Sequence, residues 1–306
     1  MNLARTVLIA PFLALGLTLL ASCIPSGSMA FLDPAELGVV VEKQTPHGSY
    51  YQYAPVNLRS PWRVAVLVHG TPPTDSSGRN DARVLVERWR MEAEARGVLL
   101  VAPAFNNTHF GSQDGPWGGY RSLLGRDIDA DEFVHAILRE YRALLPGYDE
   151  RILLYGHSAG GQFVSRYLVV HPNRVRQAVI SAAGSYAWPN ATVSFPNGMG
   201  AATLTANWGG TTNSRLFDVS EADFVAAGQV PVTVVVGTAD TEILQGPIGN
   251  TGANRWERGR NWVEDMNRFV ADNRRAGRAR FVSVEGAPHN SVPLTPASIE
   301  ALFQGL

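Results

Sequence analysis

The feature that most constrains this chain is a short apolar run, residues 151–155, that ends abruptly in Gly-His-Ser-Ala-Gly. The apolar run reads as a buried strand, and residues 162–171 read as a helix whose apolar side chains recur on one face. A serine at the tip of a sharp turn between strand and helix has strained backbone angles, and side chains two positions before or after it would collide. Gly156 and Gly160 remove those collisions. The pattern therefore predicts a nucleophile elbow with Ser158 exposed at its tip.

Apolar strands and amphipathic helices alternate along the rest of the chain. The expected strands are segments rich in apolar residues at 50–57, 62–68, 98–102, 175–183, 230–236 and 280–284. The expected helices show the helical period at 82–93, 133–145, 262–270 and 298–303. Continuous apolar strands that alternate with helices predict an α/β fold, with a mostly parallel central sheet and helices on both faces. We assign residues 46–306 to one such domain.

A serine nucleophile needs a base within hydrogen-bond reach and a group that orients this base. In this kind of sheet the three groups lie on loops at the carboxyl ends of strands, in the chain order Ser, acid, His. Two histidines follow Ser158. His171 ends the same helix and would lie on the order of 18 Å from the serine, which is too far. His289 follows the last predicted strand in a loop shaped by Gly286 and Pro288, so it is the expected base.

The acid should leave the sheet at a strand end between the serine and the base. Asp240 follows the apolar run 232–239 directly and is the favoured candidate. Glu242, two residues later, is the alternative. Other carboxylates in the interval fall on predicted helix faces, where they are expected to be solvated: Glu257, Glu264 and Asp265.

An oxyanion hole needs two backbone N–H groups that point at the developing negative charge. Ala159 should supply one, since it begins the helix after the serine, where N–H groups are unpaired and the helix dipole helps. The other should come from the loop after the strand at 62–68. Pro72 and Pro73 in that loop have no N–H to donate, so Thr71 is the expected donor.

Over most of its length the chain resembles an α/β-hydrolase, through His69-Gly70 after an early strand, the serine elbow, Asp240 and His289. In particular it is similar to bacterial esterases of the polyhydroxyalkanoate-depolymerase and feruloyl-esterase type. The resemblance implies acyl transfer through an acyl-serine on a small-molecule or oligomeric ester, with no metal or organic cofactor. Secreted depolymerases often carry disulfides, whereas Cys23 is the only cysteine here, which departs from the pattern of polymer-degrading members.

Two long segments with aromatic residues follow predicted strands, at 105–120 and 186–208. Long irregular segments inside a compact domain are usually functional. One interpretation is that Trp117, Tyr186 and Trp188 form a substrate-binding wall or a partial lid. The alternative is that these rings pack the segments onto the body of the domain.

The N-terminal 22 residues resemble a bacterial lipoprotein signal peptide, with Arg5 before an apolar run that ends in Leu-Ala-Ser-Cys. The resemblance implies cleavage before Cys23, acylation of its sulfur, a tether over residues 23–45 and attachment to a membrane surface on the periplasmic or extracellular side of the cell envelope. An ordinary secretory signal with an incidental cysteine is the alternative. The formal net charge of −1 and the absence of a prominent basic run argue against a nucleic-acid partner.

Two other functions fit parts of this pattern. A serine peptidase of the prolyl-oligopeptidase type shares the expected fold and triad, but it normally carries a further domain for which this chain has no room. A non-catalytic envelope lipoprotein could use the same fold for binding alone. The complete set of Ser158, Asp240 and His289 favours a catalyst over this last alternative.

Overall fold

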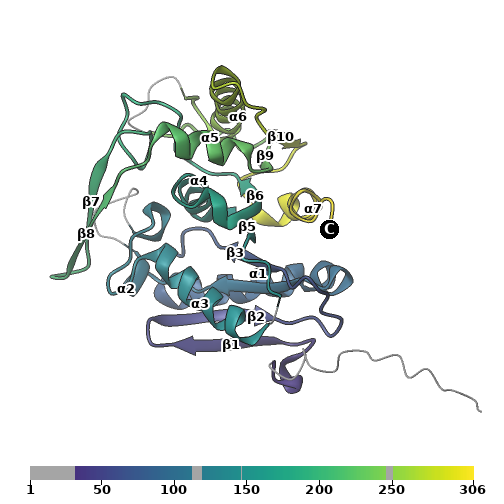
Figure 1. The fold of residues 1–306 in the computed structure, drawn as a ribbon. Coiled ribbons are helices and arrows are strands. Elements are labelled where there is room, and N and C mark those ends of the chain that lie inside the picture. The colour runs from purple at the N-terminus through teal and green to yellow at the C-terminus, as the bar shows by residue number, and fades with distance from the viewer. Residues whose placement is uncertain (1–31, 112–118, 146, 246–250) are drawn as a thin grey trace, which may run out of the picture.

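One mixed sheet organises the computed structural model, which describes residues 32–111, 119–145, 147–245 and 251–306 (Figure 1). Its strand order is β1-β2-β4-β3-β5-β6-β9-β10. From β4 to β10 all neighbouring strands pair in parallel, whereas β1 and β2 add an antiparallel edge. The strands are β1 (Val40–Thr45), β2 (Gly48–Tyr53), β3 (Val64–Val68), β4 (Leu99–Pro103), β5 (Ile152–His157), β6 (Val175–Ser181), β9 (Val232–Gly237) and β10 (Ala279–Val284).

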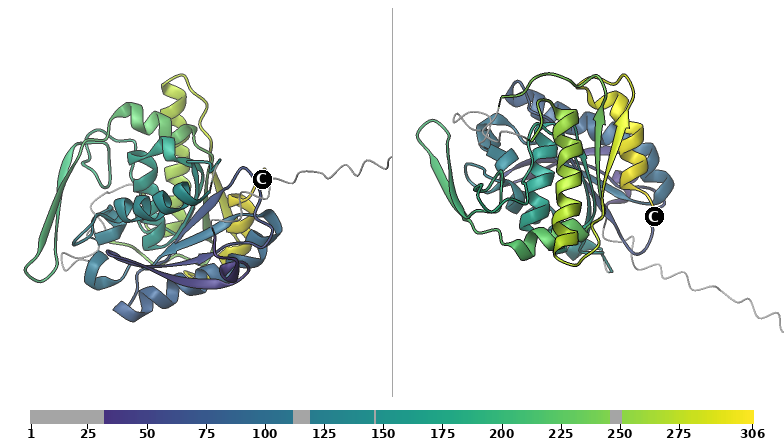
Figure 2. Two further views of the ribbon diagram at one scale, coloured as in Figure 1. Left: turned by 60° about the horizontal axis from the view of Figure 1, so that its bottom comes forward. Right: turned by 90° about the horizontal axis from the view of Figure 1, so that it is seen from above.

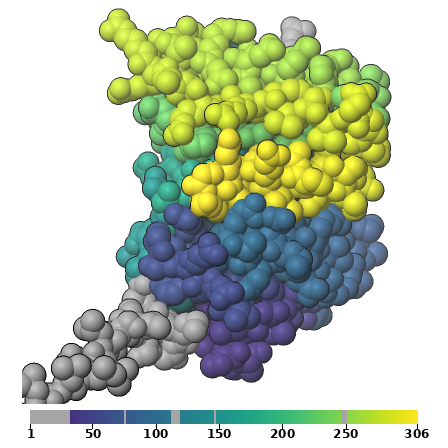
Figure 3. All heavy atoms as spheres, turned by 90° about the vertical axis from the view of Figure 1, so that its right-hand side faces the viewer, coloured from purple at the N-terminus to yellow at the C-terminus, as the bar shows by residue number. Residues whose placement is uncertain are grey.

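Helices cover both faces of this sheet (Figure 2). On one face, α1 and α7 lie side by side (Figure 3). The rings of Trp89 on α1 and Phe303 at the end of α7 pack edge to face, with their centroids 5.8 Å apart. On the other face α4 packs against β5 and β6, and α5 and α6 lie beside it. The helices are α1 (Asp75–Arg96), α2 (Asn107–Phe110), α3 (Ala130–Leu144), α4 (Ala159–Val170), α5 (Glu221–Gln229), α6 (Arg255–Asp272) and α7 (Ser291–Leu302).

The core lies between the sheet and these two helical layers. Every residue of β3, β4 and β5 is buried. Such strands read as continuous apolar runs because both of their faces are covered. The predicted α/β class with a mostly parallel sheet is therefore confirmed. Parallel pairing also brings the carboxyl ends of β3, β5, β6, β9 and β10 to one edge, which we call the carboxyl edge.

Residues 32–45 differ from the tether that the sequence suggested. A 3-10 turn at Pro34–Glu36 is followed by β1, which pairs residue by residue with β2. β1 is an edge strand with mostly half-buried residues, so it lacks the apolar pattern that marks the interior strands. The sheet thus begins at Val40, inside the segment expected to be a tether.

A second difference is the hairpin of β7 (Ala202–Asn207) and β8 (Thr212–Phe217), which projects from the body at the left of Figure 1. Its residues alternate between more and less exposed, as in a strand that packs on one side only. The turn contains Gly209-Gly210, a pair typical of tight hairpins. From the sequence, β7 falls inside the segment 186–208 that is expected to be irregular, and no structure is predicted for β8.

Within the described part of the chain, no helix combines the length and the apolar character that a membrane span requires. The predicted signal peptide and Cys23 lie outside the described residues.

Candidate active site

Ser158 occupies the junction between β5 and α4 with a positive φ of 55° and a ψ of −113°. Its N–H donates to the Ser181 carbonyl at the end of β6, 2.8 Å away. A Cβ on Gly156 would overlap the carbonyl of Gly160, and a Cβ on Gly160 would overlap the carbonyl of Val68 at the end of β3. Only glycine fits both positions, so the neighbouring strand and the helix hold the serine in its strained conformation.

Three side chains from distant parts of the sequence form one hydrogen-bonded row at the carboxyl edge. Ser158 Oγ lies 3.1 Å from His289 Nε2, and His289 Nδ1 lies 2.7 Å from Asp240 Oδ2. The elbow after β5, the loop after β9 and the loop after β10 each contribute one of them. The geometry thus brings together the three residues that sequence reasoning grouped.

Asp240 is buried and faces two positively polarised partners. Burial raises the pKa of its carboxyl. The hydrogen bond from His289 and the charge of Arg255 lower the pKa by more than burial raises it, so the net pKa lies below the ordinary value. Arg255 Nη1 lies 3.0 Å from Asp240 Oδ1, the oxygen that His289 does not use. Asp240 is therefore ionised at neutral pH and able to stabilise a positive imidazole.

Glu242, the alternative acid, pairs with Arg255 and not with the imidazole. Its side chain is 69% exposed and pairs with Arg255 at 2.9 Å. Arg255 thus bridges Asp240 and Glu242 from the first turn of α6. Sequence reasoning missed Arg255, since its role depends on where α6 begins relative to the loop after β9.

His157, directly before the serine, is a second residue that sequence reasoning missed. Its ring stacks on that of His289, with centroids 5.2 Å apart and an angle of 27° between the planes. Its Nδ1 lies 3.1 Å from Ser181 Oγ. Burial, and then the charge of the neighbouring His289, lower the pKa of His157 to about 3, so this ring is neutral at ordinary pH. Its position directly before the serine in the Gly-His-Ser-Ala-Gly motif could have identified it from the sequence.

The loop after β3 is fixed beside the serine. The Gly70 carbonyl accepts hydrogen bonds from His69 Nδ1 at 2.7 Å and from the Tyr120 hydroxyl at 2.9 Å. Arg121 donates to Thr71 Oγ1 at 3.0 Å. A Cβ on Gly70 would lie 3.5 Å from the Cβ of Ser158, so the peptide that carries the Thr71 N–H lies next to the serine.

Ala159 begins α4, where the first N–H groups have no partner inside the helix. The first hydrogen bond of this turn runs from the Gln162 N–H to the Ser158 carbonyl, at 3.0 Å. The Ala159 N–H therefore stays available at the positive end of the helix dipole. Ala159 and Thr71 thus flank the serine from α4 and from the β3 loop.

The predicted aromatic wall has a different environment from the one expected. Tyr186 is fully buried and stacks on Trp262 at 5.3 Å, and Trp188 is 5% exposed. Trp262 Nε1 donates to the Ala187 carbonyl at 2.7 Å. These rings pack the segment after β6 onto α6, which agrees with the packing alternative. Trp117 lies outside the described residues.

A buried arginine on α4 anchors the same segment. Arg166 donates to the carbonyls of Arg121 and Pro196 and to the side chains of Ser185 and Asn197. Burial lowers the pKa of Arg166 to about 9. Arg166 therefore ties the residue directly after the first aromatic segment to the second aromatic segment.

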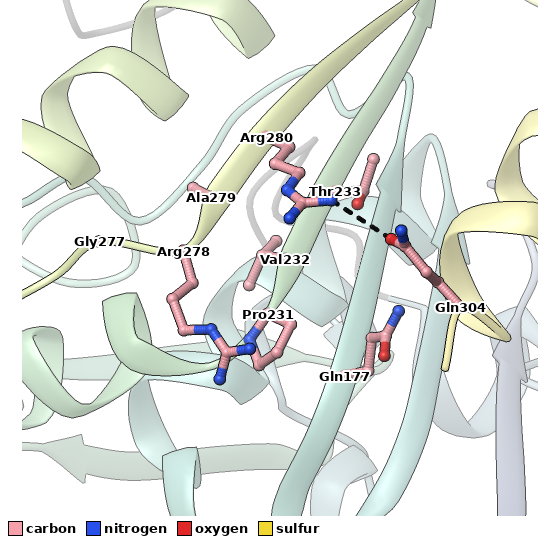
Figure 4. A pocket seen from close by; sticks show the side chains of 9 residues that line it. All are labelled: Gln177, Pro231, Val232, Thr233, Gly277, Arg278, Ala279, Arg280 and Gln304. Carbon is pink, nitrogen blue, oxygen red and sulfur yellow. Dashed lines mark hydrogen bonds between the residues drawn. The ribbon is translucent and has the colours of Figure 1, made fainter. Parts of the chain in front are cut away.

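Two adjoining pockets lie at the opposite edge of the sheet, where β6, β9 and β10 begin. The first, about 320 Å³, is lined by Arg278, Arg280, Gln177 and Gln304 among others (Figure 4). The second, about 520 Å³, shares Arg278 with it. The chain therefore does gather positive charge locally, although the net charge gave no sign of it. Both pockets are remote from Ser158.

A third pocket, about 200 Å³, lies at the carboxyl edge and is lined by Gly70, Thr71 and His157 beside the serine. Among the residues that the structure describes, no group of three or more His, Cys, Asp and Glu side chains is placed to hold a metal ion.

No protein-family model and no curated protein sequence matches the chain. Solved structures do match it over most of its length. LpqC, a poly(3-hydroxybutyrate) depolymerase from Bordetella parapertussis, is 22% identical with a TM-score of 0.66, over 89% of this chain and 92% of that one. Poly(aspartic acid) hydrolase-1 from Sphingomonas sp. KT-1 is 18% identical with a TM-score of 0.64, over 87% and 98%. A ferulic acid esterase is 15% identical with a TM-score of 0.50, over 86% and 95%.

At these identities the similarity defines the fold and nothing finer. Together with the strand order and the elbow after β5, it shows that the chain has the α/β-hydrolase fold.

Proposed function

We propose that this protein is a serine hydrolase that cleaves carboxylic esters through an acyl-serine intermediate. The observation that carries the proposal is the continuous row from Ser158 Oγ through His289 to Asp240, with contacts of 3.1 and 2.7 Å. A serine hydroxyl is a weak nucleophile by itself, and such a row is what activates it. The strained backbone at Ser158 and the two flanking N–H groups support the same chemistry.

In the first half of the proposed reaction, Ser158 Oγ attacks the ester carbonyl carbon while His289 Nε2 takes the hydroxyl proton. The N–H groups of Thr71 and Ala159 stabilise the oxyanion of the tetrahedral intermediate. When the intermediate collapses, the bond to the alcohol oxygen breaks and the imidazolium gives its proton to that oxygen. Asp240 holds the imidazole in the required tautomer and stabilises its positive charge.

In the second half, water enters where the alcohol has left. His289 takes a proton from the water as its oxygen attacks the acyl carbon. Collapse of the second tetrahedral intermediate then breaks the bond to Ser158 Oγ, which regains its proton, and the carboxylic acid is released. Each proton that His289 takes up is thus returned within the same cycle.

A fluorophosphonate probe tests the nucleophile directly, since it reacts covalently with activated serines. The full-length protein should be labelled, and Ser158→Ala should not be. Ser165→Ala is a suitable control, because Ser165 lies on α4 and its hydroxyl accepts from the Ala187 N–H rather than facing His289. Undiminished labelling of Ser158→Ala would contradict the proposal.

Substrate class is tested by parallel assays of p-nitrophenyl esters and of peptide anilides. We expect short esters to be hydrolysed with a much higher kcat/KM than anilides, and the activity to disappear in Ser158→Ala. Faster cleavage of anilides would indicate a peptidase. Failure to turn over any short-chain ester would indicate a non-catalytic role.

We further propose that the chain is held at a membrane surface by lipid on Cys23, as its similarity to lipoprotein signals suggests. Membrane fractions of a bacterial host should contain the wild-type protein, and radioactive palmitate should label it. Cys23→Ser should lose both the label and the membrane association. Unchanged fractionation of that variant would overturn this assignment.

A further inference from the structure

The third pocket lies between α1 and the start of α7, and we call it the α1–α7 pocket. His69, Gly70, Thr71 and His157 line it on the side of the serine. Asp81, Val84, Leu85 and Arg88 line it from α1, and Ser291 lines it from the first residue of α7. The α1–α7 pocket is therefore continuous with the loops that surround Ser158.

Arg88 brings a positive charge into this pocket, and this charge is not paired with a carboxylate of the described residues. Its Nη1 donates to Ser291 Oγ at 2.8 Å. Within the described ranges it forms no ion pair with a carboxylate, whereas many of the other arginines on the chain do. A guanidinium has five N–H donors in a planar fork that matches a carboxylate. Among the residues that the structure describes, the guanidinium bonds to Ser291 alone, so most of its donors can serve a ligand.

The rest of the pocket restricts where an anion could sit. Asp81 lies seven residues before Arg88 on α1, about 10 Å along the helix axis, and repels negative charge at its own end. Val84 and Leu85 line the wall between them and offer apolar contact. His69 Nε2, buried beside the same pocket, has no hydrogen-bond partner among the described residues. The pocket thus has an apolar stretch and one cationic end.

We infer that the α1–α7 pocket binds a carboxylate of the substrate through Arg88, so that the preferred esters carry a negative charge at the end of a short aliphatic chain. This inference rests on the proposed ester hydrolysis at Ser158. The half-buried guanidinium is less screened by salt than a surface arginine. A bidentate contact with a carboxylate would favour anionic esters over neutral esters of the same length.

The test compares pairs of esters in which one member carries a carboxylate where the other carries a methyl group. The p-nitrophenyl half-ester of glutaric acid is compared with p-nitrophenyl valerate, which places the charge on the acyl side. 4-Butyryloxybutanoate is compared with butyl butyrate, which places the charge on the alcohol side. Wild-type protein should prefer the charged member of one pair, and that pair identifies the side of the ester that enters the pocket.

Arg88→Gln should then lower kcat/KM for the preferred anionic ester by about 10- to 100-fold more than for its neutral partner, mainly through KM. Arg88→Lys should retain part of the preference. Arg90→Gln is the matched control, because Arg90 is an exposed arginine on the same helix that does not line the pocket, and it should leave both esters unaffected. Asp81→Asn should raise kcat/KM for the anionic ester.

The outcomes separate this inference from the proposed function. Equal loss for both members of a pair in Arg88→Gln, or no charge preference in the wild type, overturns the inference while ester hydrolysis stands. If the wild type hydrolyses none of the four esters, the proposed function itself fails. Thermal denaturation of Arg88→Gln and turnover of the neutral ester show whether the variant is folded.

Discussion

Asp240 Oδ2 and His289 Nδ1 lie 2.7 Å apart, and this single contact determines which nitrogen of the imidazole faces Ser158. A carboxylate only accepts hydrogen bonds, so Nδ1 carries the proton and Nε2 keeps the lone pair that faces the serine hydroxyl. Because Asp240 is buried, the contact is also protected from competition by water.

The first prediction concerns this contact. Asp240→Asn should leave the fold intact but reduce kcat for a short ester by about 10⁴-fold, since an amide can donate to Nδ1 and stabilise the wrong tautomer. Steady-state kinetics measure the loss, and circular dichroism checks the fold.

Glu242→Gln is the control for that variant. Glu242 lies two residues away, is largely exposed and does not contact His289. Its substitution should change kcat less than about 3-fold, in line with the small contribution of exposed ion pairs. A larger loss in Glu242→Gln than in Asp240→Asn would mean that the acid has been misassigned.

Arg255 gives a prediction about pH. Its positive charge contributes to the lowered pKa of Asp240, together with the hydrogen bond from His289, against the effect of burial. Removing the charge in Arg255→Met should raise that pKa. With a raised pKa the carboxyl becomes protonated at a higher pH, so the acid limb of the kcat/KM profile should move to higher pH.

Two variants control for side effects at this position. Arg255→Lys retains a positive charge and should keep the acid limb near its wild-type place. Arg260→Gln removes an exposed arginine from the same helix, one that lies over the Trp256 ring rather than against Asp240, and should not move it. A profile of Arg255→Met that coincides with the wild type would show that Arg255 does not influence Asp240.

The parallel interior of the fold could be predicted from the sequence because burial on both faces leaves unbroken apolar runs such as 64–68 and 152–155. Edge elements lack that signal. β1 is a half-buried edge strand with four polar residues after Val40 and Val41, and the β7–β8 hairpin packs on one side only, so neither shows a continuous apolar run.

The grouping of Ser158, Asp240 and His289 could be predicted for a topological reason: in a parallel sheet, residues that directly follow strands meet at one edge. Contacts that depend on the packing of particular side chains could not. Arg255 reaches Asp240 only because α6 begins beside the loop after β9, and Tyr186 is buried because Trp262 lies across from it. The sequence next to these residues does not indicate either contact.

His157 leads to the third prediction. Its ring stacks on the His289 ring, so His157→Ala should leave that imidazole less well positioned and lower kcat by about 10- to 100-fold. His157→Phe keeps an aromatic ring in place and should recover most of the loss, although it gives up the contact with Ser181. Since the pKa of His157 is about 3, neither variant should move the acid limb of the profile above that pH. A shifted limb would indicate that His157 titrates during catalysis.

The last prediction concerns the stability of the fold, through Asp131 at the start of α3. Asp131 Oδ2 lies 2.7 Å from His171 Nε2 and 3.0 Å from Arg215 Nη2, so it joins α4 and the β7–β8 hairpin to α3. Burial raises its pKa, but these two partners lower it more, to about 2 from an ordinary 3.8.

Because the folded pKa of Asp131 is depressed, its stabilisation is complete above about pH 4 and disappears as the pH falls toward 2. A shift of this size corresponds to about 2 kcal/mol. Asp131→Asn should therefore reduce the free energy of unfolding by at least about 2 kcal/mol at pH 7, and by much less at pH 2.5, in urea titrations at the two pH values. Asp265→Asn changes a carboxylate on α6 whose side chain is 40% exposed, and it should cost less than about 0.5 kcal/mol at both pH values. If Asp131→Asn lost the same free energy of unfolding at both pH values, the stabilisation by Asp131 would not depend on its charge. The lowered pKa of Asp131 would then not explain that stabilisation.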